Sequence, residues 1–439
     1  MGDYTKLAMS AGAPPRARDS SSRTVLFISR WFPPAFQIGG KRAYRFARYL
    51  PEHGWRPIVW TGFLDDGVPH DPTPVELPPE AVVDRTLIPR WWPEPKRARA
   101  TGADITPGRP LQRPGPLQRL RRQVSLPVGA PVLLLPQQLR RLSTLIELYR
   151  PDAIMATASP YWTLVLGARA ARRFGLPLVL DLRDPWTNNF LQGQKAGWVQ
   201  RAEAATERHC LTAANSVVFT APATTAAYQA LYPSLADRFT TITNAFDPAQ
   251  LPTEAAARGA DRLLVHFGAC DGTRRLDNVL YGLAALRDRG EVDLDELRLL
   301  NLGKPDADDL ALAERIGVRM EVEPFAPLEE GLALLASADV QVLVGFGDES
   351  MFIPAKLFDY LLSGAPILAL GHAAQVGAIV EGTGSGLAVT GEDPHTTAEA
   401  LRRLLTGEFG PRDRRAVRAY AAPSVAETLA GVLERAVTD

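Results

Sequence analysis

The chain has 439 residues, of which 46% are hydrophobic and 22% are charged, and this length suits two α/β domains that each bury their own core. Its 49 basic residues balance 49 acidic ones, which argues against a general nucleic-acid binder, because such proteins are usually basic. The two cysteines, Cys210 and Cys270, cannot form a disulfide framework, so we expect a cytoplasmic protein.

The chain begins with a segment that lacks the apolar core of a signal peptide, and we predict a disordered tail over residues 1–23. Apolar residues 24–29 then predict a buried strand, followed by a loop that ends in Gly39-Gly40 and by a helix. A glycine pair between a strand and a helix lets backbone amides approach a phosphate closely. Lys41 and Arg42 beside it would either strengthen such an anion site or be solvated.

Residues 65–130 interrupt this pattern and are predicted to be a proline- and arginine-rich insertion. Between 85 and 122 it holds ten basic residues against two acidic ones, together with two tryptophans. Basic residues with tryptophan suit an anionic membrane surface, and the alternative is an insertion whose charges are simply solvated. The most apolar run, 124–135, is too short to cross a bilayer.

Alternating strands and helices resume from 137, and the strand predicted over 176–182 delivers Arg183, Asp184 and Trp186 at its carboxyl end. In open α/β sheets, ligands bind beyond the carboxyl ends of the strands. We therefore expect these three residues to handle a polar substrate, the alternative being an Arg–Asp pair that holds the loop.

A second half with the same pattern starts after the linker predicted over 248–261. Its first strand ends in Gly268, and the following loop brings Arg274 and Arg275 to the start of a helix. A guanidinium can bind a diphosphate bidentately, so these arginines are candidates for that role, and we favour Arg274.

The central stretch of the second half is 340–370, which predicts a strand, a polar loop, a helix and another strand. Lys356 lies in the first turn of that helix, where its charge opposes the helix dipole unless a phosphate is its partner. Asp359, one turn further on, is placed to accept hydrogen bonds from a ribose. The alternative is a surface helix on which both side chains are solvated.

The run PAKLFDYLLSGAPILAL at 354–370 resembles the donor-nucleotide segment of GT-B glycosyltransferases of family 4. Their signature has two glutamates separated by seven residues, and the second acidic position corresponds to Asp359 here. The first corresponds to Met351, which is not acidic, and Glu349 nearby is a candidate substitute. The DLRDPW run at 181–186 and the TNAFDP run at 243–248 also resemble segments of these enzymes.

The resemblance implies a GT-B fold, in which two Rossmann-like, doubly wound domains face each other across a cleft. It places an acceptor domain at 24–247, a nucleotide-sugar domain at 262–423 and a terminal helix that crosses back to the first domain at 424–439. Donor contacts would come from Gly39, Gly40, Gly268, Arg274, Lys356 and Asp359. Arg183, Trp186 and Glu349 would contact the acceptor or line the cleft, and Asp184 is the candidate catalytic proton acceptor.

By this resemblance the protein moves a sugar from a nucleotide-diphosphate sugar to an acceptor hydroxyl with retention of anomeric configuration. We expect no cofactor and no metal, since no Asp-x-Asp motif stands at the end of a strand. The acceptor would be a glycan, a lipid-linked glycan or a small molecule, with peripheral contact to the inner membrane face through 85–122. Two alternatives are an epimerase or hydrolase that acts on nucleotide sugars, and a non-catalytic nucleotide-sugar-binding subunit.

Overall fold

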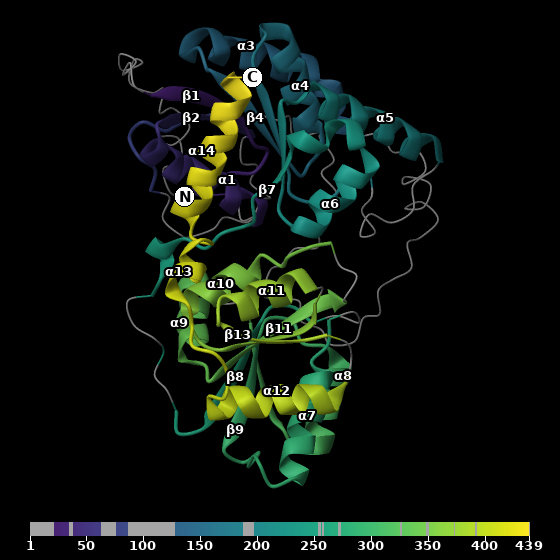
Figure 1. The fold of residues 1–439 in the computed structure, drawn as a ribbon, viewed down its shortest axis with the longest axis vertical. Helices are drawn as coiled ribbons and strands as arrows, with labels where there is room; N and C mark the ends of the chain where they lie inside the picture. The colour runs from purple at the N-terminus through teal and green to yellow at the C-terminus, as the bar shows by residue number, and fades with distance from the viewer. Residues whose placement is uncertain are drawn as a thin grey trace, which may run out of the picture. The chain divides into compact units, whose positions relative to one another are not determined.

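The computed structural model describes most of the chain and divides it into two compact units, which are drawn in Figure 1. Of the described residues, the first unit holds those up to Thr243 together with Ala422–Thr438, and the second holds Asn244–Ala421. The described residues are 22–34, 38–62, 76–86, 128–187, 197–252, 256, 259–270, 274–324, 327–347, 351–372, 374–390 and 393–438.

The first unit is built on a seven-stranded parallel sheet with the strand order β3-β2-β1-β4-β5-β6-β7. Its strands are β1 (Arg23–Ile28), β2 (Trp55–Gly62), β3 (Val82–Thr86), β4 (Ala153–Ala158), β5 (Leu178–Leu182), β6 (Ser216–Phe219) and β7 (Phe239–Thr241). Both faces of the central strands are covered, and β1, β4 and β5 are therefore apolar along almost their whole length.

Alternation along a strand decides which helix each side chain meets. Leu26 and Ile28 of β1 face a core that includes residues of the helices α3 (Leu135–Tyr149) and α4 (Trp162–Phe174). Phe27, between them, contacts Phe46 of α1 (Ile38–Tyr49) through rings 6.4 Å apart.

The last helix of the chain, α14 (Ala422–Thr438), also belongs to the first unit and packs on α1 and on the short helix η2 (Leu50–His53). His53 Nε2 lies 3.2 Å from the Pro423 carbonyl, and Arg23 forms a 2.7 Å ion pair with Glu434. The remaining helices of this unit are η3 (Ala130–Leu134), α5 (Gly197–Ala213), α6 (Pro222–Leu231) and η4 (Pro233–Arg238).

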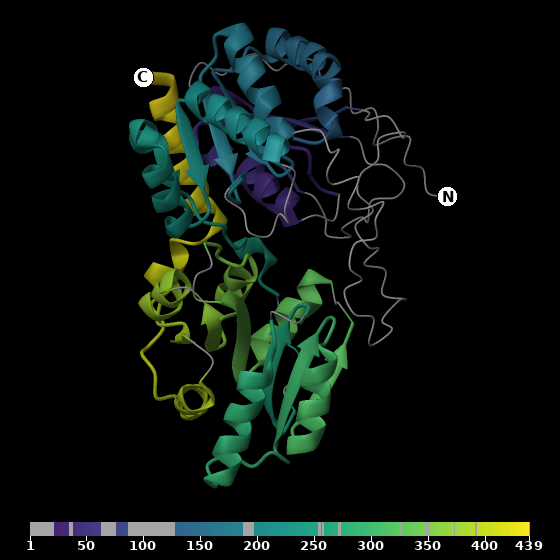
Figure 2. The same ribbon diagram turned by 90° about the vertical axis from the view of Figure 1, so that its right-hand side faces the viewer.

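The second unit repeats the architecture with a six-stranded parallel sheet in the order β10-β9-β8-β11-β12-β13. Figure 2 shows the ribbon from the side, with strands of this unit drawn as green arrows between helices. Its strands are β8 (Arg262–Phe267), β9 (Leu297–Leu302), β10 (Arg319–Glu323), β11 (Val340–Gly347), β12 (Ile367–His372) and β13 (Gly386–Val389). Its helices are η5 (Pro248–Gln250), α7 (Asp277–Asp288), α8 (Ala307–Ile316), α9 (Leu328–Ser337), α10 (Lys356–Ser363), α11 (Ala374–Gly382), α12 (Pro394–Thr406) and α13 (Arg414–Arg418). Two parallel sheets with interleaved helices confirm the predicted α/β class.

The structure differs from the sequence prediction at two places in the first unit. Helix α1 starts at Ile38, so Gly39 and Gly40 lie in its first turn instead of in the preceding loop. Residues 82–86, inside the predicted insertion, form the edge strand β3, which pairs in parallel with β2. Residues 1–21 of the predicted 1–23 tail and most of the 85–122 segment lie outside the described residues, while Arg23 already belongs to β1. Among the helices that the structure describes, none has both the length and the apolar character needed to cross a membrane.

Candidate active site

Helix α10 is fixed against the sheet of the second unit by a buried tyrosine. The Tyr360 hydroxyl accepts a hydrogen bond from the Phe267 amide at 2.8 Å and donates one to the Val342 carbonyl at 3.1 Å. These two contacts join the helix to the carboxyl end of β8 and to the first half of its neighbouring strand β11. At the other end of α10, Gln341 donates to the Ala365 carbonyl at 2.6 Å. The first turn of α10 is therefore held over the carboxyl end of β8.

Lys356, the first residue of α10, lies across Gly268, the residue that follows β8. Its Nζ occupies the space that a β-carbon on residue 268 would need, and Gly268 has a φ of +154°. The glycine backbone is anchored by a 2.8 Å hydrogen bond from its amide to the Leu302 carbonyl. The ammonium group thus sits directly on the backbone at the carboxyl end of a central strand, which is where α/β sheets bind ligands.

A second cation, Arg274, acts together with Lys356 on the buried His266 of β8. His266 of β8 is 2% exposed, with its Nδ1 2.9 Å from the Val342 carbonyl. Burial, together with the charges of Lys356 and Arg274, lowers the pKa of His266 to about 3. Both cations therefore lie close enough to His266 to act on it, and the ring stays neutral near pH 7. Gly268 and Lys356, predicted separately from the sequence, are in contact here, and Arg274 lies within electrostatic range of His266 on β8.

Arg275, the other candidate in this loop, is engaged within its own unit. It lies 3.3 Å from the buried Asp309, 3.5 Å from Asp277 and 3.6 Å from Asp308. Asp309 also accepts a hydrogen bond from the Leu276 amide at 2.9 Å, so this arginine secures the start of α7. The arrangement favours Arg274 as the residue that contacts an anion.

Two more predicted donor residues belong to the α10 region. Asp359 is half-buried on α10, one turn after Lys356. Glu349, proposed as a substitute for the acidic residue missing at Met351, lies outside the described residues. Within the described ranges, no group of three or more His, Cys, Asp or Glu side chains is placed to hold a metal ion.

In the first unit, the glycine pair and Arg183 come together at the start of α1. The Arg183 guanidinium lies where a β-carbon on Gly39 would be, and Gly40 approaches the backbone of Trp31 and Phe32. Arg183 is oriented by donating to the carbonyls of Ala158 and Ser159, the latter at 3.1 Å. Arg183 thus lies with the glycines that we predicted for the donor diphosphate.

The other two residues of the DLRDPW loop point to different environments. Asp184 is exposed, yet partial desolvation by the surrounding protein raises its pKa, with the charge of Arg183 opposing the change. Trp186, by contrast, is 1% exposed and stacks on Tyr161 at 4.8 Å. Its ring belongs to the core of the first unit and supports the loop from inside. This differs from the sequence prediction, which placed Trp186 at the acceptor or in the cleft.

Sequence reasoning missed a buried ion pair behind this loop. Asp181 of β5 is fully buried and binds Arg42 of α1 at 3.0 Å, and Thr157 donates to the same carboxylate at 2.8 Å. Arg42 also donates to the carbonyls of Ile242 and Thr243, at 3.0 and 2.6 Å. Arg42 is therefore neither a solvated side chain nor an anion ligand, because Asp181 neutralises its charge inside the unit. A carboxylate within the apolar run LVLDL was the available signal.

A second buried carboxylate, Glu207 of α5, supports the same loop from behind. It accepts hydrogen bonds from the hydroxyls of Tyr228 and Thr187, and Tyr228 in turn accepts one from the Trp186 amide at 2.8 Å. Burial raises the pKa of Glu207, while the bonds from Thr187 and Tyr228 oppose that shift. A glutamate in an amphipathic helix gives no sequence signal for this role.

Residues 39–245 match the family described as Glycosyl transferase 4-like domain. Among curated proteins, none matches the sequence significantly.

Several solved structures share the fold. Sucrose-phosphate synthase from Thermosynechococcus elongatus is 17% identical with a TM-score of 0.63, over 94% of this chain and 98% of that one. An α,α-trehalose-phosphate synthase (UDP-forming) from Burkholderia vietnamiensis is 11% identical with a TM-score of 0.59, over 94% and 100%. HepE from Anabaena, in complex with UDP and glucose, is 15% identical with a TM-score of 0.51, over 93% and 95%.

The two parallel sheets, the ligand-facing strand ends and the family match lead to one conclusion. The chain has the fold of GT-B glycosyltransferases, and its residues 39–245 match the family described as Glycosyl transferase 4-like domain.

Proposed function

We propose that the protein transfers a sugar from a nucleotide-diphosphate sugar to an acceptor hydroxyl, without a metal ion and with retention of anomeric configuration. The observation that carries the proposal is the placement of Lys356 on Gly268 with Arg274 nearby. Two cations at the carboxyl end of a central strand form a site for a diphosphate. HepE, which shares the fold, is in complex with UDP and glucose, and this supports a nucleotide-sugar donor here.

The donor would lie mostly on the second unit. Lys356 and Arg274 neutralise the diphosphate, and Asp359, one turn after Lys356, accepts hydrogen bonds from the ribose. Breaking the anomeric C–O bond leaves negative charge on the diphosphate. Fixed cations stabilise that charge as it develops, and they supply the electrostatic role that a metal ion has in other transferases.

The first unit contributes groups of the same kind. The first turn of α1 carries Gly39 and Gly40, whose backbone amides have no intrahelical partner, and Arg183 lies across Gly39. We assign these donors to the diphosphate as well. Asp184 takes the proton from the acceptor hydroxyl, and its raised pKa favours proton transfer because a base is most effective when its pKa lies nearer the working pH.

A ligand-induced shift in melting temperature tests the donor site directly. The full chain is heated with UDP-, GDP- and dTDP-sugars, where a ligand at 100 times its Kd adds about 2.7 kcal/mol to stability. Lys356→Ala should remove most of the shift, whereas Arg415→Ala, an exposed arginine of the same unit, should keep it. A full shift in Lys356→Ala would place the phosphates elsewhere.

One observation favours a second candidate, a hydrolase or epimerase that acts on nucleotide sugars. Met351 stands where the family signature has a carboxylate, and the loss of that contact changes how the sugar is held. Product analysis separates the two functions, because release of the nucleotide without a new glycoside indicates hydrolysis. Binding without any turnover would indicate a non-catalytic partner subunit.

The acceptor is proposed to be a glycan, a lipid-linked glycan or a small molecule. Contact with an anionic membrane through 85–122 rests on the basic and tryptophan-rich composition of that segment alone. Flotation with anionic vesicles should fall in a variant that lacks these residues. Unchanged flotation would end the membrane proposal.

A further inference from the structure

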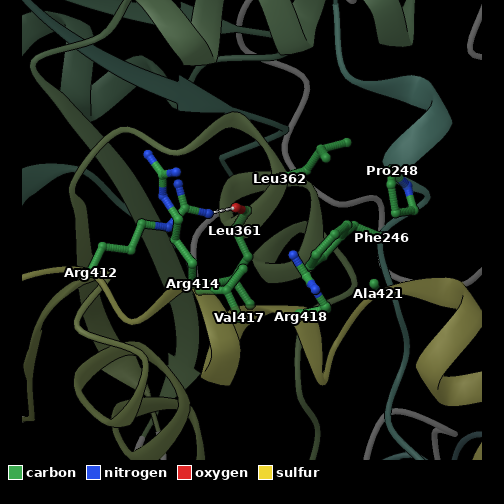
Figure 3. Close-up of a pocket in the computed structure, with 9 residues that line it drawn as sticks. All are labelled: Phe246, Pro248, Leu361, Leu362, Arg412, Arg414, Val417, Arg418 and Ala421. Atoms are coloured by element: carbon green, nitrogen blue, oxygen red, sulfur yellow. Dashed lines mark hydrogen bonds between the residues drawn. The ribbon is translucent and has the colours of Figure 1, made fainter.

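An open pocket of about 280 Å³ lies in the second unit, and none of the donor residues described above lines it. Its floor is apolar and its rim carries three arginines, Arg412, Arg414 and Arg418 (Figure 3). The apolar lining consists of Phe246, Pro248, Leu361, Leu362, Val417 and Ala421.

The pocket is built by segments that are distant in sequence and fixed to one another. The Phe246 amide donates to the Tyr420 carbonyl at 3.1 Å, and Phe246 pairs with Ala421 in a short parallel bridge. The opposite wall is the last turn of α10, where the Leu361 carbonyl accepts a hydrogen bond from Arg412. The walls are thus held together by hydrogen bonds within the unit, two of the segments through their backbones and the third through the Arg412 side chain.

The rim is positively charged, and no acidic side chain of the described pocket lining neutralises it. In the part of the chain that the structure describes, none of the three rim arginines forms an ion pair, and no acidic side chain lines the pocket. Arg412 is half-buried, and its guanidinium occupies the space above Gly364. Burial lowers the pKa of Arg412, and the neighbouring charge of Arg414 adds to this shift. Two positive groups are therefore held together where an anion would relieve their repulsion.

We propose that this pocket binds a small soluble anion that carries one apolar ring or short apolar chain. The rim supplies guanidinium groups, which suit a phosphate or carboxylate, and the floor supplies apolar side chains for the remainder of the ligand. The volume corresponds to about nine water molecules, which is less than a drug-sized ligand requires.

The pocket is separate from the donor site, although both use α10. Lys356 and Asp359 belong to the first turn of the helix, whereas Leu361 and Leu362 belong to its last turn. Occupation of the pocket should therefore survive the loss of Lys356. The arginine-rich segment 85–122 does not suit the pocket, because its ten basic residues would meet three more.

Calorimetry with three probes tests the proposal on the full chain. Phenyl phosphate has both the ring and the anion, benzyl alcohol has the ring alone, and inorganic phosphate has the anion alone. Phenyl phosphate should bind at least about tenfold more tightly than either, since the ring and the charge each contribute on the order of 1.4 kcal/mol. Equal binding of inorganic phosphate, equal binding of benzyl alcohol, or no binding of phenyl phosphate at millimolar concentration would overturn the proposal.

Matched variants locate the binding. Arg418→Gln should weaken phenyl phosphate about tenfold, as expected for one charge-assisted hydrogen bond. Arg415→Gln, on the same short helix but outside the pocket, and Lys356→Ala, at the donor site, should leave the affinity unchanged. Equal losses in Arg415→Gln, or loss in Lys356→Ala, would overturn the assignment. The assignment would also be overturned if the protein floated with phosphatidylglycerol vesicles in a way that depends on Arg418 and did not bind phenyl phosphate. The rim would then be a lipid-binding surface.

Discussion

The ammonium group of Lys356 and the α-carbon of Gly268 share a space that admits no β-carbon. The two positions are therefore coupled, because the Lys356 side chain fits only where residue 268 has no side chain. The first prediction follows from this relationship.

Gly268→Ala should abolish most of the melting-temperature shift produced by a nucleotide sugar, because the new methyl group displaces the Lys356 ammonium from the site. The free protein should lose some stability as well, since a φ of +154° is unfavourable for alanine. Gly410→Ala, where a β-carbon meets open space, is the control and should leave the shift unchanged. A full shift in Gly268→Ala would show that the Lys356 position is not needed for binding.

Arg42→Met should cost the first unit about 3–5 kcal/mol, because it leaves the Asp181 carboxylate buried without its cation. Chemical denaturation monitored by fluorescence measures this free energy of unfolding. Arg172→Met, at an exposed position on α4, should change it by less than about 0.5 kcal/mol. Equal stability of the two variants would mean that the buried pair contributes little.

Stability should fall in acid because of His266. Its pKa is lowered to about 3 in the folded protein and is near 6.5 in an unfolded chain. Below about pH 6.5 the His266 side chain binds a proton in the unfolded chain but not in the folded one. The free energy of unfolding therefore decreases as the pH falls toward 3. At about pH 5 the loss is about 2 kcal/mol.

Urea denaturation at several pH values measures that slope. His266→Asn keeps an N–H group for the Val342 carbonyl and cannot titrate, so its acid slope should be shallower by one proton. His395→Asn, at an exposed position, should leave the slope as it is in the parent protein. Parallel slopes in the parent protein and His266→Asn would contradict the assignment.

Gly386→Ala should destabilise the second unit by more than about 1 kcal/mol, because its β-carbon would collide with the backbone of Ile367 on the neighbouring strand β12. A backbone atom cannot move aside as a flexible side chain can. Gly382→Ala, four residues earlier with no neighbour in the way, is the matched control. Thermal unfolding of both variants distinguishes this contact from a general effect of alanine.

The sequence predicted the α/β class and the α10 region well because the signals there are local. Gly364 ends α10 with a φ of +88°, as the glycine after an apolar helix indicated, and Lys356 begins it just after Pro354. Each of these features depends on residues within a few positions of one another.

The failures share another cause, which is packing between residues far apart in the chain. Arg42 looked like an anion ligand because Asp181, its partner, is 139 residues away. Trp186 looked like a substrate contact because it follows the carboxyl end of a strand, but its ring stacks on Tyr161 in the core. Periodicity reports which face of an element is apolar, but it does not report which distant charge neutralises a given side chain.

The return of α14 to the first unit has a consequence for how the protein is made. Leu429 and Leu433 of this helix are fully buried in that unit, although they are synthesised after the whole of the second unit. On the ribosome, the first unit therefore receives α14 only after the whole of the second unit has been synthesised. The unit whose synthesis begins first is thus completed only after the other has been made.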